Sequence, residues 1–171
     1  TSMRDQASPI TIDERRGRLE RAKQLMTAHK IDAIMLTGGT STVYFANVRW
    51  WVSERLFAIV LPVKGTPFVV CPAFEEERAH EQLSTGPAGD AQVYTWEEDE
   101  DPYARVAQGL RDRGLATARL GVEETVKFVF SDGVAKASPQ VTLTSGTPVT
   151  AGCRMIKDAH ELQLMRLAAG V

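Results

Sequence analysis

Helical spacing of apolar residues first occurs between Thr11 and about His29. Thr11 and Glu14 have the spacing of a capping box, in which each side chain binds the backbone N–H of the other residue. The arginines of this segment, including Arg15 and Arg18, are expected to fall mostly on the polar face. The sequence therefore predicts an amphipathic helix whose apolar face carries Ile12, Leu19, Ala22 and Met26.

Short apolar runs bounded by turn residues predict the strands. Residues 63–66 suit a hairpin turn between two adjacent runs, and Thr37 to Ser41 is predicted to be a plain turn. The predicted strands are residues 31–36, 56–61, 67–71, 92–96, 119–123 and 141–144.

Further helices are predicted between the later strands. Asp101 has the character of an N-cap with Pro102 in the first helical position, and Gly114 is a natural stop. Asp158 and Glu161 form a second capping box near the C-terminal end. The helices are expected at residues 74–83, 102–114, 128–137 and from 158 onward. This alternation, with one hairpin, predicts a layered α/β domain with a mixed five- to six-stranded sheet flanked by helices.

Composition narrows the class of protein. The 171 residues are 43% hydrophobic with a net charge of −2, which is typical of a soluble globular domain and gives no broad footprint for nucleic acid. No apolar run is long enough to cross a membrane, and no export signal precedes the first helix, so a cytoplasmic location is expected. In that compartment Cys71 and Cys153 are expected to be free thiols. Thr1 and Ser2 before Met3 are typical of a tag remnant.

No catalytic set is recognisable in the sequence. The histidines, His29, His80 and His160, stand apart from one another without metal-ligand spacing, so each is interpreted as structural or solvent-facing. The glycines of the turn at 37–41 match no phosphate-binding motif. The acidic residues 97–101 precede a predicted helix, where the helix dipole favours negative charge. We therefore predict no catalytic and no metal-binding residues in this chain.

The stretch at residues 44–55, YFANVRWWVSER, has no clear period. Trp50 and Trp51 are adjacent, so in an extended segment they point in opposite directions and one of them is expected to be exposed. An exposed Trp close to Arg49 and Arg55 suits an interface or the edge of a ligand site, where Trp and Arg are over-represented.

The closing segment resembles a known junction. Arg154, Lys157 and Asp158, followed by Glu161-Leu162 and Met165-Arg166, resemble the R-x-x-K-[SD]-x-x-E-[IL]-x-x-[MI]-[RK] junction of the creatinase, prolidase and aminopeptidase P family. The upstream order agrees, from the helix with Arg15-Arg16 through the Tyr44-Phe45 pair to the hairpin with Lys64-Gly65. The resemblance covers the chain from about Ile10. It departs from the family at Ala46-Asn47, where relatives often have Thr-Gly or Ser-Gly.

The resemblance implies a non-catalytic N-terminal domain and a separate catalytic domain. Residues 1–10 would be a tag remnant and N-terminal extension, residues 11–153 a non-catalytic creatinase/prolidase N-terminal-like domain, and residues 154–171 the start of a linker helix. That helix would lead to a C-terminal metallopeptidase domain holding two divalent ions (Mn, Co or Zn). The whole protein would be a Xaa-Pro dipeptidase or aminopeptidase, a hydrolase acting on short proline-containing peptides. Its N-terminal domain would support homodimer formation and restrict the active-site entrance.

The resemblance also suggests substrate-binding residues. By its spacing from Tyr44, Arg55 corresponds to an arginine that approaches the substrate carboxylate in creatinase-like members, and a guanidinium suits a carboxylate bidentately. Trp50 or Trp51 would pack against the proline ring or the partner subunit. Two alternatives stay open: the N-terminal domain of a creatinase-type C–N hydrolase, and a protein-interaction module from a catalytically inactive relative. If the closing helix leads into a catalytic domain, Leu162, Met165 and Ala169 are expected to lack most of their intended packing partners in this chain.

Overall fold

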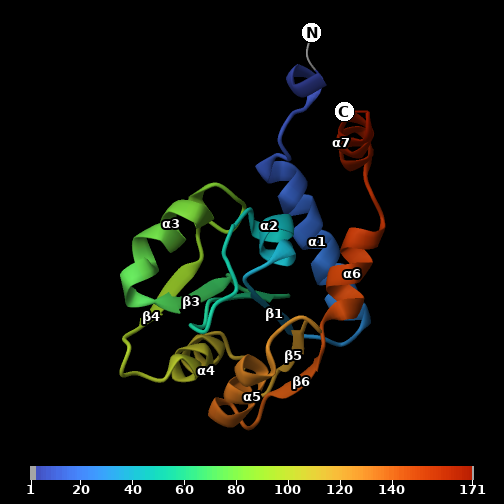
Figure 1. Ribbon diagram of the computed structural model, residues 1–171. Coiled ribbons are helices and arrows are strands. Elements are labelled where there is room, and N and C mark those ends of the chain that lie inside the picture. Colours follow the sequence, from blue (N-terminus) through green and yellow to red (C-terminus); the bar gives the residue numbers. More distant parts are fainter. Residues whose placement is uncertain (1–2, 171) are drawn as a thin grey trace.

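A computed structural model describes residues 3–170. Its centre is a six-stranded mixed sheet in the order β4-β3-β2-β1-β5-β6 (Figure 1). β2 pairs antiparallel with both of its neighbours, whereas the β3–β4, β1–β5 and β5–β6 pairs are parallel. The predicted mixed sheet is thus confirmed. The strands are β1 (Ala33–Thr37), β2 (Ala58–Pro62), β3 (Phe68–Pro72), β4 (Gln92–Trp96), β5 (Arg119–Val122) and β6 (Thr142–Ser145).

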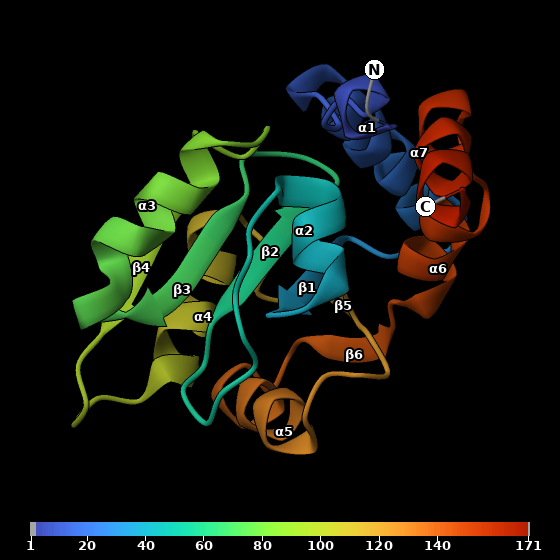
Figure 2. The same cartoon turned by 45° about the horizontal axis from the view of Figure 1, so that its top comes forward.

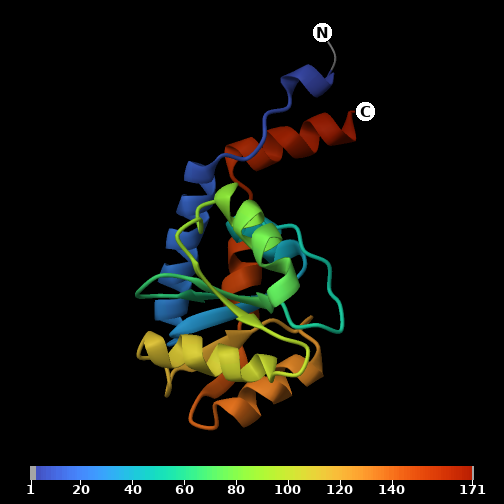
Figure 3. The same ribbon diagram turned by 90° about the vertical axis from the view of Figure 1, so that its left-hand side faces the viewer.

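Helices cover both faces of the sheet (Figure 2 and Figure 3). One face packs against α1 (Ile12–Ala28), α2 (Thr40–Ala46), α3 (Glu76–Ser84) and α6 (Thr147–Met155). The other face packs against α4 (Pro102–Asp112) and α5 (Phe128–Ala137). The remaining elements are η1 (Met3–Gln6), η2 (Ala73–Glu75) and α7 (Ala159–Ala169).

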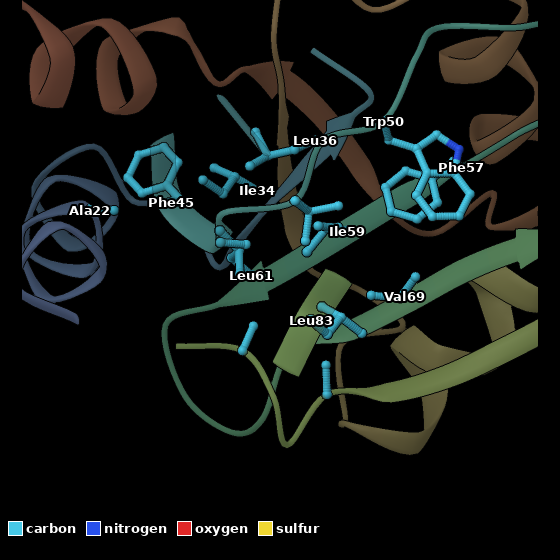
Figure 4. Close-up of a cluster of buried hydrophobic side chains, with 14 of the residues drawn as sticks. Ala22, Ile34, Leu36, Phe45, Trp50, Phe57, Ile59, Leu61, Val69 and Leu83 are labelled. Atoms are coloured by element: carbon cyan, nitrogen blue, oxygen red, sulfur yellow. The ribbon is translucent and has the colours of Figure 1, made fainter. Parts of the chain in front are cut away.

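The alternation of strand side chains builds two separate cores. On β1, Ile34 and Leu36 join the cluster under α1, α2 and α3, whereas Ala33 and Met35 join the cluster under α4 and α5. β2 and β3 divide their side chains in the same way. Because both faces of the sheet are buried, these strands are continuous apolar runs in the sequence. Figure 4 shows part of the first cluster, in which Phe45, Trp50 and Phe57 supply the aromatic rings.

Three sequence expectations need correction. The predicted turn at Thr37–Ser41 is cut short, because α2 already begins at Thr40. α6 lies in a stretch for which no helix was predicted. Arg15 and Arg18 are buried rather than on a polar surface, because they donate hydrogen bonds to backbone carbonyls at the end of α2.

Other local predictions are confirmed. Both capping boxes form, Thr11 with Glu14 at α1 and Asp158 with Glu161 at α7. Asp101 caps α4 by accepting a hydrogen bond from the Tyr103 N–H. Within residues 3–170, no helix combines the length and the hydropathy that a membrane crossing requires.

The closing helix α7 is attached mainly by polar contacts. Figure 3 shows it projecting away from the layered body beside the N-terminal segment. None of its described side chains is buried, and Leu162 and Met165 are 40% and 54% exposed, so this domain covers them only in part. His160 Nδ1 lies 2.8 Å from a Glu14 carboxylate oxygen, and its Nε2 lies 3.0 Å from the Ser8 carbonyl oxygen.

The His160–Glu14 contact makes the attachment of α7 dependent on pH. The hydrogen bond to Glu14 raises the pKa of His160 above its ordinary value of 6.5. The contribution of protonated His160 is therefore complete below about pH 6.5 and is lost as the pH rises through the raised pKa. We expect an NMR titration of the His160 ring to give a pKa above 6.5, and Glu14→Gln to lower it. Gln at this position can still serve the capping box. A His160 pKa that Glu14→Gln leaves unchanged would contradict the contact.

Candidate functional site

The loop between α2 and β2, residues 47–57, presents the sequence-predicted binding residues. Trp50 is 7% exposed and Trp51 is 85% exposed, so the prediction that one of the pair faces solvent is confirmed. Among the residues that the structure describes, Trp51 is the most exposed large apolar side chain. So exposed a Trp is typical of a contact surface, because burial against a partner molecule would remove a large apolar area from water.

Trp50 fixes the loop to the protein core. Its ring stacks on Phe57 with a centroid separation of 4.0 Å and an interplanar angle of 10° (Figure 4). On Arg78 of α3, the guanidinium carbon lies 4.3 Å from the Trp50 ring centroid. Trp50 thus anchors the loop in the core, while the side chain of its neighbour Trp51 is exposed and can contact another molecule.

The loop begins in a constrained conformation. Asn47 has a φ of 56°, the left-handed region that Gly adopts most easily and Asn next. This explains how Asn stands where the resembling family often has Gly. The Asn47 amide donates to the Thr85 carbonyl at 3.2 Å, and the Val48 N–H donates to the Thr42 carbonyl at 3.1 Å.

Two glycines allow the end of α2 and the loop to lie close to the rest of the domain. A Cβ on Gly38 would lie 2.6 Å from the Trp50 carbonyl oxygen, and one on Gly86 would lie 1.9 Å from the Ala46 carbonyl oxygen. Both distances are far below contact distance, so neither position accepts a larger residue without movement of the backbone. The role of Gly38 was missed at the sequence level, where it was interpreted as part of a plain turn.

Arg55 lies at the other end of the loop. Its side chain is 51% exposed, and its Nε donates a hydrogen bond of 2.7 Å to Glu98. This hydrogen bond raises the pKa of Arg55 above its ordinary value. The guanidinium carbon also lies 5.6 Å from the Phe74 ring centroid. Glu98 shows that the Arg55 guanidinium can hold a carboxylate, and an incoming carboxylate would compete with it.

Exposed apolar side chains occur within the loop and on the segments next to it. Val52, Phe74 and Phe128 are 50%, 68% and 80% exposed. Lys127, which precedes α5, donates from Nζ to the Ser53 carbonyl oxygen at 3.3 Å, so the start of α5 lies against the loop. Exposed apolar surface of this kind, together with charged groups, is typical of interaction sites.

The described residues offer no second candidate with recognisable chemistry. Between residues 3 and 170, no group of three or more His, Cys, Asp or Glu is placed to hold a metal ion. Cys71 and Cys153 are free and buried, and burial raises the pKa of Cys71 to about 12. A cavity of about 390 Å³ lies between α1 and the β2–β3 hairpin, but Trp50, Trp51 and Arg55 are absent from its lining.

Comparison with known sequences places the chain among peptidase relatives. Residues 18–156 match the family described as Creatinase/Prolidase N-terminal domain. An uncharacterized peptidase of Schizosaccharomyces pombe is 31% identical over 175 residues, which cover 95% of this chain and 37% of that protein. The probable dipeptidase PepE of Mycobacterium bovis is 30% identical over 135 residues, 79% of this chain and 34% of that protein. The chain thus spans about a third of the length of these curated relatives (37% and 34%).

Solved structures share the fold. The dipeptidase PepE from Mycobacterium ulcerans superposes with a TM-score of 0.75 at 28% identity, over 86% of this chain and 38% of that one. The N-terminal domain of a Xaa-Pro dipeptidase from Lactobacillus brevis superposes with a TM-score of 0.66 at 20% identity, over 81% of this chain and 99% of that one. In the second case the likeness concerns the fold.

Proposed function

Because this chain belongs to the creatinase/prolidase N-terminal domain family, we propose that it is the non-catalytic N-terminal domain of a Xaa-Pro peptidase. The observation that carries the proposal is the family match over residues 18–156, supported by similarity to proteins named as dipeptidases. This chain covers only 34% of one of those relatives and 38% of another, so most of their length lies outside the matched part and leaves room for a catalytic domain.

A metal pair of Mn²⁺, Co²⁺ or Zn²⁺ belongs, in this proposal, to the C-terminal domain. The described residues of this chain do not fit such a pair, because they bring no three carboxylate, imidazole or thiolate groups together. The role of this chain is therefore to shape the active-site entrance and to position the substrate. α7, with its exposed Leu162 and Met165, is the element that continues toward the catalytic domain.

The loop of residues 47–57 restricts the entrance to the active site and contributes to a homodimer. Three observations support this role: the 85% exposure of Trp51, the exposed apolar side chains around it, and the anchoring of the loop through Trp50. A rigid loop that presents a Trp suits both purposes, because little conformational freedom is lost on contact.

Arg55 binds the carboxylate of the substrate. The Arg55–Glu98 pair supports this assignment, because Glu98 holds the guanidinium in place and can be exchanged for another carboxylate at an exposed position. Trp51 then packs against the proline ring or against the second subunit.

In the full-length protein that contains this domain, Arg55→Ala should raise KM for a Xaa-Pro dipeptide by about tenfold or more, because a charge-assisted hydrogen bond is lost. The same substrate with an amidated C-terminus should show almost no change. Steady-state kinetics on both substrates measure the difference. Arg16→Ala is a matched control, since Arg16 is also exposed and paired with one carboxylate, that of Asp13.

The outcomes separate two parts of the proposal. Equal effects of Arg55→Ala on the free and amidated substrates would remove the carboxylate role. An unaltered protein that hydrolyses no Xaa-Pro dipeptide would contradict the peptidase assignment itself.

A further inference from the structure

Two arginines of α1 hold the carboxyl end of α2. Arg15 donates from Nε to the Val43 carbonyl oxygen at 3.1 Å, and Arg18 donates from Nη1 to the Tyr44 carbonyl oxygen at 2.9 Å. These carbonyls belong to the last turn of a seven-residue helix, and the Val43 carbonyl also accepts a hydrogen bond from the Asn47 N–H, so Arg15 is its second donor. Cations at this end also interact favourably with the helix dipole.

Arg18 has a second partner on α7. It is 9% exposed, its guanidinium carbon lies 4.0 Å from the Tyr44 ring centroid, and its Nη2 lies 3.7 Å from a carboxylate oxygen of Glu161. Among the described residues, no hydrogen-bond partner reaches Arg18 Nε. A buried cation with so few partners depends strongly on the carboxylate that balances its charge, so its position is tied to that of α7.

Tyr44 adds a tie between α2 and the end of α6. Its hydroxyl donates to the Cys153 carbonyl oxygen at 3.1 Å. α2 in turn continues directly into the candidate loop: Thr42 Oγ1 donates to the Val48 carbonyl oxygen at 2.9 Å, and the Val48 N–H donates to the Thr42 carbonyl oxygen. A movement of the carboxyl end of α2 must therefore move the beginning of the loop.

We propose that Arg18 is a positioning residue, which links the docking of α7 to the geometry of the loop that carries Trp51 and Arg55. When Glu161 is in place, Arg18 is held over Tyr44 and fixes the end of α2. When Glu161 is withdrawn, the buried charge loses its carboxylate, and the end of α2 and the loop loosen together. The consequence for substrate binding rests on the proposed function, whereas the link between α7 and the loop does not.

Hydrogen exchange of the 171-residue chain tests the link. The substitution is Glu161→Gln, which removes the charge and keeps a residue that can serve the capping box. The reporters are the backbone amides of Val48 and Arg49, which are hydrogen-bonded to the Thr42 carbonyl and the Gln82 side chain. We expect both amides to exchange about tenfold faster, while amides of the central strands keep their rates. Glu20→Gln is the control, because Glu20 is an exposed carboxylate of α1 paired with Lys23.

A second variant separates the link from general destabilisation. Arg18→Gln should accelerate the same two amides, and adding Glu161→Gln to it should produce no further increase, since the Glu161 charge acts on the end of α2 only through Arg18. The proposal is overturned if Glu161→Gln accelerates only amides of α7, or if it accelerates exchange uniformly across the chain. No peptide hydrolysis is measured, so this result is independent of the peptidase assignment.

Discussion

Gly86→Ala should destabilise the domain by about 3 kcal/mol, because overpacking against backbone cannot be relieved by a side-chain rotation. The new Cβ would lie 1.9 Å from the Ala46 carbonyl oxygen and 2.7 Å from its carbonyl carbon. Either α2 or the segment after α3 must shift, and both support the candidate loop. Thermal unfolding followed by circular dichroism should show a midpoint lowered by roughly 10 °C.

Gly89→Ala is the matched control for this prediction. It lies three positions away on the same connection, and its nearest neighbour would be the Leu83 carbonyl oxygen at an ordinary 3.6 Å. Its unfolding midpoint should stay within a few degrees of the unaltered protein. Similar midpoints for the two variants would show that the close approach of Gly86 to α2 is not a constraint in solution.

Trp50→Ala should cost about 4 kcal/mol of folding free energy, because it empties a buried site. The lost contacts are the stacked ring of Phe57 at 4.0 Å and the guanidinium of Arg78 at 4.3 Å. Denaturation in urea measures the loss, and the amides of the loop should exchange faster in the same variant.

The adjacent Trp51→Ala should change stability by no more than about 0.5 kcal/mol, because its side chain is 85% exposed. The pair of variants removes the same chemical group from neighbouring positions, so the contrast reports the packing alone. If both variants lose stability equally, Trp51 is part of the core in solution and is not available for a partner.

Elements with strong local signals could be predicted from the sequence. β4 and α5 have the predicted bounds, Gln92–Trp96 and Phe128–Ala137, and the capping boxes mark the starts of α1 and α7 within a residue. In these segments the period, the caps and the turn residues agree with one another, so local preference and tertiary structure point to the same result.

The helices that were missed are held by distant partners. α2 has seven residues, several of them β-branched, and its carboxyl end is stabilised by arginines that come from α1. Such a helix has little intrinsic stability, and its existence depends on tertiary contacts. The burial of Arg15 and Arg18 was unpredictable for the same reason, since long basic side chains are ordinarily placed at the surface.

In the candidate site too, local features could be predicted from the sequence and distant contacts could not. The opposite exposures of Trp50 and Trp51 follow from their adjacency in the sequence, which is a local argument. Two distant partners shape the site. Glu98, which pairs with Arg55, lies 43 residues away along the chain, and Gly86, which packs against Ala46, lies on the connection that follows α3. No spacing pattern in a single sequence reveals contacts of that kind.

Hydrolysis of a Xaa-Pro dipeptide by the full-length protein tests the central claim most directly. With Mn²⁺ or Co²⁺ present, the full-length protein should cleave Gly-Pro in preference to Gly-Ala, and the 171-residue chain alone should cleave neither. Turnover by the chain alone, or a full-length protein that cleaves no Xaa-Pro bond with either metal, would contradict the account.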